Sequence, residues 1–245
     1  MGALLEVVDL SKRFGALEVV QDFSFDVAEG EALGIVGPNG AGKTTLLNLV
    51  AGDLRADKGT VSLDGQSLTK LPAHVRCHHG IGRTAQIPRP FEGLTVFENV
   101  LVGSTFGARG RLTGTREEAA VVALEQGGML DKANVVAGSL TLLDRKRLEL
   151  ARALATQPRL LLLDEIAGGL TEAEVLELVA TIKEIRATGV AIVWIEHIVH
   201  ALLRVVDRMM AVDSGRKLIE GDPQEVMASS EVRSVYLGDD LGGEP

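Results

Sequence analysis

The chain has 245 residues, 46% of them hydrophobic, which is enough for one large α/β domain with a sizeable core. Its formal net charge of −9 argues against a nucleic-acid-binding protein, because such proteins need a positive surface to neutralise phosphates. With a single cysteine, no signal-like N-terminus and no apolar run near the about 20 residues that span a bilayer, we expect a cytoplasmic protein that meets a membrane only through a partner.

The N-terminal part of the chain favours strands. Residues 4–8 and 19–27 have the apolar pattern of half-buried strands. Residues 59–63 give a third strand signal, which the Asp64-Gly65 turn closes. We expect these strands to form an antiparallel flank.

A glycine-rich loop at residues 37–45 matches the pattern G-x-x-x-x-G-K-[ST] in full. Residues 32–36 are typical of a buried strand leading into the loop, and residues 44–50 of a helix leaving it. In that context the backbone N–H groups and the helix N-terminus suit a polyphosphate. Lys43 would then reach the β- and γ-phosphates, and the hydroxyl of Thr44 would bind Mg²⁺. The alternative is a glycine-rich turn with no ligand.

Residues 72–79 suit a short helix, which we expect Gly80 and Gly82 to end. Three possible metal ligands fall on one face of this helix at i, i+3 and i+4: His74, Cys77 and His78. A structural zinc needs a fourth ligand, and the sequence signals none nearby. We therefore favour the alternative, in which histidines near the end of a helix stabilise its dipole.

Residues 91–155 show several helix signals and no convincing strand. Thr115 and Glu118 form a capping-box pattern at the start of a helix that Gly127 and Gly128 would end. This segment is predicted to be an inserted helical lobe.

The last third of the chain alternates strands and helices again. Residues 160–163 are four leucines, as expected for a strand at the centre of a parallel sheet, and residues 190–195 predict a second buried strand. Residues 172–186 have apolar side chains at helical spacing. Residues 208–220 suggest a closing hairpin, and residues 238–245 a loose acidic tail.

Three polar side chains follow the two buried strands. Asp164 and Glu165 come after the leucines, and His197 comes just past the next strand. Beside a phosphate loop, Asp164 is placed to hold Mg²⁺ through water, and Glu165 to polarise water as a general base. His197 would emerge at the same sheet edge, where it could contact the γ-phosphate. The alternatives are an ordinary acidic strand end and a structural histidine.

The order of these motifs resembles that in the ATP-binding subunits of ABC transporters, over essentially the whole chain. Gln86 matches the family's Q-loop, Asp164 and Glu165 its Walker B end, and His197 its switch histidine. Phe14 matches the aromatic residue that stacks on adenine. The resemblance implies an α/β fold of the P-loop NTPase type, with a mixed central sheet, an antiparallel β flank and an inserted helical subdomain. It also implies ATP hydrolysis, with ATP and Mg²⁺ as cofactors.

The resemblance assigns roles to particular residues. Catalysis would involve Lys43, Gln86, Glu165 and His197. Mg²⁺ would be held by Thr44, Gln86 and, through water, Asp164. ATP would be bound by Phe14, Gly37, Pro38, Asn39, Gly40, Ala41, Gly42, Lys43, Thr44 and Thr45.

The resemblance also implies four parts of the chain. Residues 1–86 would form the nucleotide-binding core with its β flank, and residues 87–156 a helical signature subdomain that starts with a permease-contact loop. Residues 157–221 would complete the core, and residues 222–245 would form a C-terminal helix and tail.

In this family two ATPase subunits pair head to tail, and each ATP lies between the phosphate loop of one chain and the signature motif of the other. That motif is usually Leu-Ser-Gly-Gly-Gln, whereas residues 140–144 read Leu-Thr-Leu-Leu-Asp and lack both glycines, which let backbone N–H groups approach a γ-phosphate. Thr141 keeps a hydroxyl that could still contact the partner's ATP. Alternatively, Thr141 and Asp144 form a capping box and make no contact across the dimer.

Three segments look most like the branched-chain amino acid importer subfamily: residues 80–86, 91–100 and 235–238. A related urea or amide importer would look similar. The chain departs from the wider family at Ile166, where proline is usual, and at Thr171, where aspartate is usual. Ala85 stands where the subfamily often has an aromatic residue.

The predicted protein is an ATPase subunit at the cytoplasmic face of the membrane that powers import of branched-chain amino acids or a related small amino acid or amide. Its expected partners are a second ATPase subunit, transmembrane permease subunits and, indirectly, an extracytoplasmic substrate-binding protein; nucleic acid is not an expected partner. One alternative is an ABC-type ATPase not coupled to transport, which would carry long coiled coils or tandem cassettes. Another is a P-loop small-molecule kinase, whose lid would need arginines near the γ-phosphate. The helical lobe favours the ABC transporter.

Overall fold

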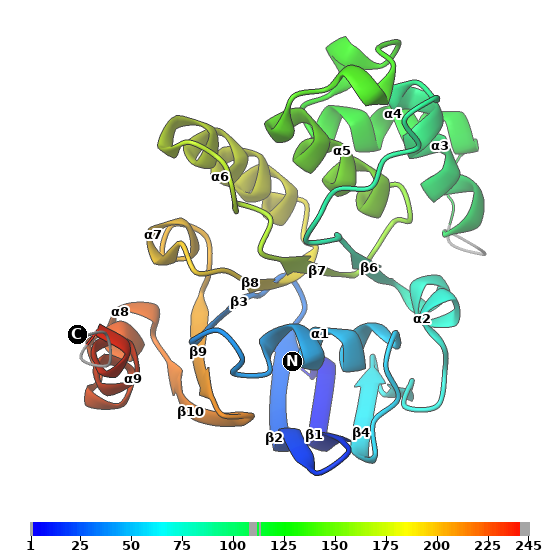
Figure 1. Cartoon of the computed structure of the whole chain (residues 1–245). Coiled ribbons are helices and arrows are strands. Elements are labelled where there is room, and N and C mark those ends of the chain that lie inside the picture. The colour runs from blue at the N-terminus through cyan, green and yellow to red at the C-terminus, as the bar shows by residue number, and fades with distance from the viewer. Residues whose placement is uncertain (1, 108–111, 113, 241–245) are drawn as a thin grey trace.

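Two β-sheets organise the part of the chain that the computed structural model describes, which is residues 2–107, 112 and 114–240 (Figure 1). The larger sheet has the strand order β10 (Arg216–Gly221), β9 (Arg208–Asp213), β3 (Ala32–Val36), β8 (Ala191–Ile195), β7 (Leu160–Asp164) and β6 (Ile81–Arg83). Only the β10–β9 pair in it is antiparallel, so this sheet is mixed, as predicted. The smaller sheet is antiparallel, in the order β2 (Leu17–Ala28), β1 (Ala3–Phe14), β4 (Lys58–Leu63) and β5 (Gln66–Ser67).

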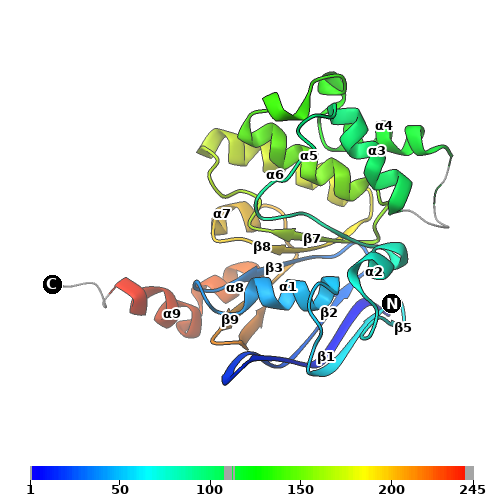
Figure 2. The ribbon, with the colours of Figure 1, turned by 45° about the vertical axis from the view of Figure 1, so that its right-hand side comes forward.

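Helices connect these strands and cover the larger sheet. The α-helices are α1 (Lys43–Ala51), α2 (Ala73–His79), α3 (Val96–Phe106), α4 (Arg116–Gln126), α5 (Leu142–Leu154), α6 (Glu172–Ala187), α7 (Val199–Leu202), α8 (Pro223–Ala228) and α9 (Ser230–Asp240). Figure 2 shows α1 on one side of β7 and β8, and α5 and α6 on the other.

The central strand β7 is buried on both faces, which explains its run of leucines. Leu160 and Leu162 pack into a core shared with α1 and the antiparallel sheet. Leu161 and Leu163 point to the opposite face, into a core shared with α4, α5 and α6. Because successive side chains of a strand point to opposite faces, a strand between two cores needs apolar residues at every position. The prediction of a central parallel strand is confirmed.

The helical lobe lies between β6 and β7 in the sequence and above the larger sheet in Figure 1. Its helices α3 and α4 begin at Thr95 and Thr115, and each threonine forms a reciprocal capping box with a glutamate three residues on. The box predicted at Thr115 and Glu118 is therefore confirmed, and Gly127 follows the helix as its C-cap. Residues 108–111 and 113 of the predicted lobe lie outside the described residues.

Tertiary pairing corrects several sequence-based boundaries. Strand β1 runs through Phe14 and not only over residues 4–8, because it pairs with β2 on one side and β4 on the other. Gly80 ends α2 as predicted, with φ of +112°, but Gly82 lies in β6. A Cβ atom at Gly82 would approach Pro158 Cβ to 2.9 Å, so the close packing of β6 requires glycine there.

The C-terminal part differs from the predicted loose tail. Helix α9 continues to Asp240, so residues 238–240 are helical, while residues 241–245 lie outside the described part of the chain. Helices α8 and α9 lie beside the β9–β10 hairpin (Figure 1). That hairpin was predicted and is confirmed.

A buried arginine joins α1 to the segment before α2. Arg76 is 2% exposed, and its guanidinium donates to the carbonyl oxygens of Leu49 and Val50 in the last turn of α1, at 2.8 and 2.9 Å. It also donates to the carbonyl oxygens of Leu71 and Thr69, at 2.9 and 3.1 Å. Burial lowers the pKa of Arg76. The carbonyl groups at the end of a helix have no partner within the helix, so Arg76 satisfies groups that would otherwise be buried without a hydrogen bond.

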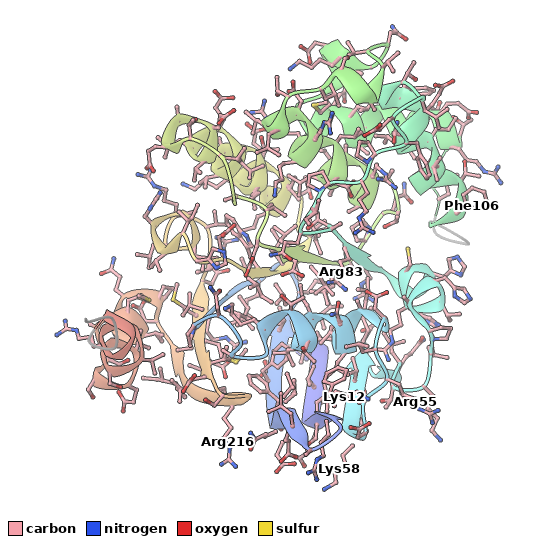
Figure 3. All side chains as sticks on the ribbon, viewed as in Figure 1. Lys12, Arg55, Lys58, Arg83, Phe106 and Arg216 are labelled. Carbon is pink, nitrogen blue, oxygen red and sulfur yellow. The ribbon has the colours of Figure 1, made fainter. Side chains whose placement is uncertain are left out.

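We predict that Arg76→Met lowers the free energy of unfolding by about 2–4 kcal/mol, because two buried and two partly buried carbonyl groups lose their donor. Urea titration followed by circular dichroism measures the change. Arg55→Met is the matched control, since Arg55 (Figure 3) is an exposed arginine that lines the same cavity as Arg76. It should change the free energy of unfolding by less than about 0.5 kcal/mol. If both substitutions lowered the free energy of unfolding equally, the hydrogen bonds of Arg76 would not be the source of its stabilising effect.

Candidate functional site

The glycine-rich loop packs closely against the backbone of two neighbouring segments. Gly40 and Gly42 have φ of +81° and +95°, which favours glycine over other residues. A Cβ atom at Gly42 would lie 2.4 Å from the carbonyl oxygen of Val19, and one at Gly37 would lie 2.1 Å from that of Val212. The loop joins β3 to α1, as predicted, and lines a cavity of about 290 Å³. Glycine at residues 37 and 42 is therefore required by the close approach of Val212 and Val19, and a loop of this kind at the start of a helix suits the phosphates of a nucleotide.

Lys43 lies beneath this loop. It is 5% exposed, and its ammonium donates to the carbonyl oxygens of Gly37 and Pro38 at 2.7 and 2.9 Å. Burial lowers its pKa, and the carboxylates of Glu165 and Asp164 oppose that shift. Its contact with phosphate groups stays a prediction, and the short distance to two loop carbonyls shows that the ammonium already faces the loop.

Asp164 and Thr44 meet at the end of β7, as expected for a Mg²⁺ site. The hydroxyl of Thr44 donates to the carboxylate of Asp164 at 3.3 Å, and Asp164 is 1% exposed. Burial raises the pKa of Asp164, while the guanidinium of Arg83, 3.1 Å from the carboxylate, opposes the shift. Hydroxyl and carboxylate oxygens are the ligands that Mg²⁺ prefers, so these residues fit the metal.

Arg83 is a member of this site that the sequence did not indicate. It lies at the end of β6, between α1 and the helical lobe (Figure 3), and also pairs with Asp53 just after α1. No pattern in the sequence marks Arg83, because its two partners lie 30 and 81 residues away.

Of the three residues expected around a γ-phosphate, two contact the carboxylate of the third, Glu165. The amide of Gln86 donates to Glu165 Oε2, and His197 Nε2 lies 3.3 Å from the same oxygen. Glu165 has φ of +47°, a strained conformation for this residue, and its backbone N–H donates to the carbonyl oxygen of Ile195 at 2.9 Å. The structure thus brings together Gln86, Glu165 and His197 as predicted, but their chemical roles stay predictions.

Gln86 also lies near the expected metal ligands. It lines the cavity of the phosphate loop and a second cavity of about 500 Å³ that Thr44 and Asp164 line too. Its amide contacts Glu165, so a bond from Gln86 to Mg²⁺ remains a prediction.

Glu196 is another functional candidate that the sequence analysis missed. It is fully buried, and burial raises its pKa. One carboxylate oxygen accepts from the backbone N–H of Ala167 at 2.7 Å, and the other accepts from that of His197 at 3.0 Å. Ala167 follows Glu165 by two residues, so Glu196 ties together the two segments that carry Glu165 and His197. An acidic residue next to His197 was the only signal in the sequence.

Phe14, the residue expected to stack on adenine, does not line the cavity at the phosphate loop. It ends β1 and is 48% exposed, with the ammonium of Lys12 at 5.7 Å from the ring centroid. Val19, from β2, lines the cavity at the phosphate loop and Phe14 does not. The adenine-stacking role of Phe14 stays a prediction.

Thr141 begins a helix, which is the alternative that its sequence context left open. Its hydroxyl accepts from the backbone N–H of Asp144 at 3.2 Å and donates to the carboxylate of Asp144 at 2.9 Å. The predicted capping box forms only in part, because the carboxylate of Asp144 turns to that hydroxyl and to Lys132, at 2.6 Å. Leu142 is 42% exposed and Leu143 is buried.

The possible metal ligands on α2 do not form a metal site. No group of three or more His, Cys, Asp or Glu side chains that could hold a metal ion is found within the described residues. His78 Nε2 lies 2.9 Å from the carbonyl oxygen of Phe106, and its ring packs edge-on against His74.

Of the helices described, none is long and apolar enough to cross a membrane.

Comparisons with known proteins agree with this geometry. The family model described as ABC transporter matches residues 20–168. The lipopolysaccharide export ATP-binding protein LptB of Acidithiobacillus ferridurans is 36% identical over 98% of this chain and 98% of its own length. The high-affinity branched-chain amino acid transport ATP-binding protein BraF of Pseudomonas aeruginosa is 34% identical over 96% of this chain and 98% of its own.

A solved ATP-binding cassette of an ABC transporter in its ADP conformation has a TM-score of 0.87 and 28% identity, and covers 97% of this chain and 100% of its own. The combination of phosphate loop, buried strand-end aspartate and convergent Gln86, Glu165 and His197 is the arrangement expected of such a cassette. The chain therefore belongs to the ABC transporter family, as a cassette that binds ATP with Mg²⁺ and hydrolyses it.

Proposed function

We propose that this cassette powers an importer for branched-chain amino acids or a related small amino acid or amide. The observation that carries the proposal is the subfamily-like sequence of residues 80–86 and 91–100, supported by the similarity to BraF. These two segments comprise β6, the turn at Gln86 and the start of α3. They lie in the part of the fold where the core meets the helical lobe.

The same part of the fold offers a surface for permease subunits. Ile81, Val102 and Phe106 line an apolar cavity of about 410 Å³ between β6, α2, α3 and α5. Phe106 is 68% exposed (Figure 3), and Ile87, which lines the neighbouring cavity of about 500 Å³, is 67% exposed. Exposed apolar side chains around a hollow are typical of a protein interaction site. We propose that a cytoplasmic segment of the permease docks there, and that the cassette works at the cytoplasmic face of the membrane.

Within the cassette, each site residue has a proposed role. Glu165 would accept a proton from the attacking water, and His197 and Gln86 would hold Glu165 and the γ-phosphate in position. Lys43 would neutralise phosphate charge, and Asp164 would hold the Mg²⁺ hydration shell with Thr44. All of these site residues belong to the proposed core, which consists of residues 1–86 and 157–221. The proposed helical subdomain consists of residues 87–156, and the proposed C-terminal part of residues 222–245.

Dimerisation is part of the proposal. Leu142 and Leu143 stand where the signature motif usually has glycines, and their side chains hinder a close approach of the backbone to a partner's ATP. We therefore propose that the phosphate loop of this chain works with the signature motif of a second ATPase subunit, and that an extracytoplasmic binding protein delivers the substrate to the permease. Lipopolysaccharide export is the second candidate, because LptB, at 36% identity, is slightly more similar to this chain than BraF is, at 34%.

The two candidates differ in what drives ATP hydrolysis. The cassette should be co-purified with the permeases encoded beside its gene and placed in vesicles. We expect uptake of a branched-chain amino acid or an amide that depends on ATP and on a binding protein. ATPase stimulation by lipopolysaccharide, with no uptake of amino acids or amides, would instead support export.

Glu165→Gln should retain ATP affinity and lose about 10²–10⁴-fold in turnover, because the amide cannot accept a proton. ATP binding is measured with a fluorescent ATP analogue and turnover by phosphate release. Glu172→Gln, an exposed glutamate at the start of α6, is the control that should keep normal turnover. Normal turnover in Glu165→Gln would rule out the general base.

The isolated chain should bind ATP but hydrolyse it slowly, because its site lacks the signature motif of a partner. Turnover per chain should rise when the chain concentration is raised or a second ATPase subunit is added. Fast hydrolysis that does not depend on concentration would contradict the requirement for a partner.

A further inference from the structure

The turn that carries Gln86 is attached to helix α5 through its backbone. Lys146 of α5 is 4% exposed, and its ammonium donates to the carbonyl oxygen of Gln86 at 3.0 Å. The side chain of the same Gln86 donates to Glu165. Lys146 therefore holds the backbone of a residue whose side chain contacts the proposed general base.

A second attachment lies three residues further along the segment. The carboxylate of Glu149, 7% exposed, accepts from the backbone N–H of Arg89 at 3.0 Å. Arg152 donates to the carbonyl oxygen of Arg89 at 3.0 Å and to the carboxylate of Glu149 at 2.9 Å. The guanidinium of Arg152 also lies 5.0 Å from the ring centroid of Phe91. Both backbone groups of Arg89 are thus bound to α5.

Lys146, Glu149 and Arg152 follow one another at intervals of three residues, so they share one face of α5. Six residues of helix advance about 9 Å. Three residues of chain from Gln86 to Arg89 reach at most about 10 Å. The segment is therefore long enough for both attachments to be made at once. We call these three side chains the α5 clasp.

The charges near Lys146 fit this arrangement. Burial lowers the pKa of Lys146, and the carboxylates of Glu196, Glu165 and Glu149 oppose that shift. A buried ammonium near three carboxylates could be stabilised by a hydrogen bond to any one of them. Its hydrogen bond to a carbonyl oxygen of the Gln86 turn, and not to one of those carboxylates, indicates a use beyond charge balance.

We propose that the α5 clasp positions Gln86 against Glu165, and that Lys146 is a positioning residue for ATP hydrolysis. The inference rests on the proposed roles of Gln86 and Glu165 and is independent of the transported substrate. Helix α5 begins at Thr141, the stretch aligned with the signature motif. The clasp therefore joins the Gln86 turn to the helix that carries this stretch.

The main test uses Lys146→Met, which removes the ammonium and keeps an apolar stem. We expect turnover to fall about tenfold with ATP affinity within about twofold of the parent, because the phosphate loop is untouched and only the Gln86 turn is displaced. Lys146→Arg should restore most of the turnover. Arg147→Met is the matched control, since Arg147 lies next along α5 and pairs with Glu177 of α6.

A double-mutant cycle with Gln86→Ala shows whether Lys146 acts through Gln86. In the Gln86→Ala background, Lys146→Met should cause no further loss of turnover. Additive losses, or a loss in Arg147→Met equal to that in Lys146→Met, would overturn the clasp. Normal turnover in Gln86→Ala would show instead that the proposed role of Gln86 is wrong, and would overturn the inference with it.

Hydrogen exchange of the nucleotide-free chain gives a readout independent of activity. Lys146→Met should speed exchange of the Arg89 N–H, measured in a peptide covering residues 86–91, because loosening the Gln86 end of the segment weakens the hydrogen bond from that N–H to Glu149. Arg147→Met should leave this exchange unchanged. If Lys146→Met does not fold, Arg152→Gln replaces it, with an expected loss of turnover of about threefold that disappears in the Gln86→Ala background. Unchanged exchange in a folded clasp variant would refute the proposal.

Discussion

The burial of β7 between two cores decides where the chemistry of this protein takes place. Because both faces of the strand are covered, the first polar side chains can emerge only at its end, where Asp164 and Glu165 stand. The backbone N–H of Glu165 donates to the carbonyl oxygen of Ile195 at the end of β8. The end of β7 is thereby fixed to the strand that precedes His197, and the strained φ of Glu165 is held by this pairing.

Charge is concentrated at this sheet edge, where buried charged groups lie near groups of opposite sign or accept hydrogen bonds from the backbone. Asp164 is balanced by Arg83, and Lys43 lies near Glu165 and Asp164. Glu196 has two backbone donors in addition. Such a site keeps ionised groups in a water-poor place, because an unpaired buried charge would cost several kcal/mol.

The helical lobe is connected to this edge by hydrogen bonds to the backbone of residues 86–89. These bonds come from side chains of α5, the helix that begins at the stretch aligned with the signature motif. The position of the Gln86 turn is thus tied to that of α5. The departures at Leu142 and Leu143 affect what the N-terminus of α5 can offer to a partner, whereas the clasp lies further along the helix.

The sequence by itself determined the elements whose signals are local. The phosphate loop, the leucine strand and the capping box at Thr115 depend on neighbours within a few residues, and the structure has them as predicted. The polar residues at the strand ends could be named because parallel strands must end at one edge of a sheet. Only the tertiary structure decided that Arg83 pairs with Asp164, that Glu196 joins the segments of Glu165 and His197, and that Lys146 holds the Gln86 turn. Most of these contacts join residues 29 to 81 positions apart, and they form only when packing has brought the separate elements together, so no local pattern could reveal them.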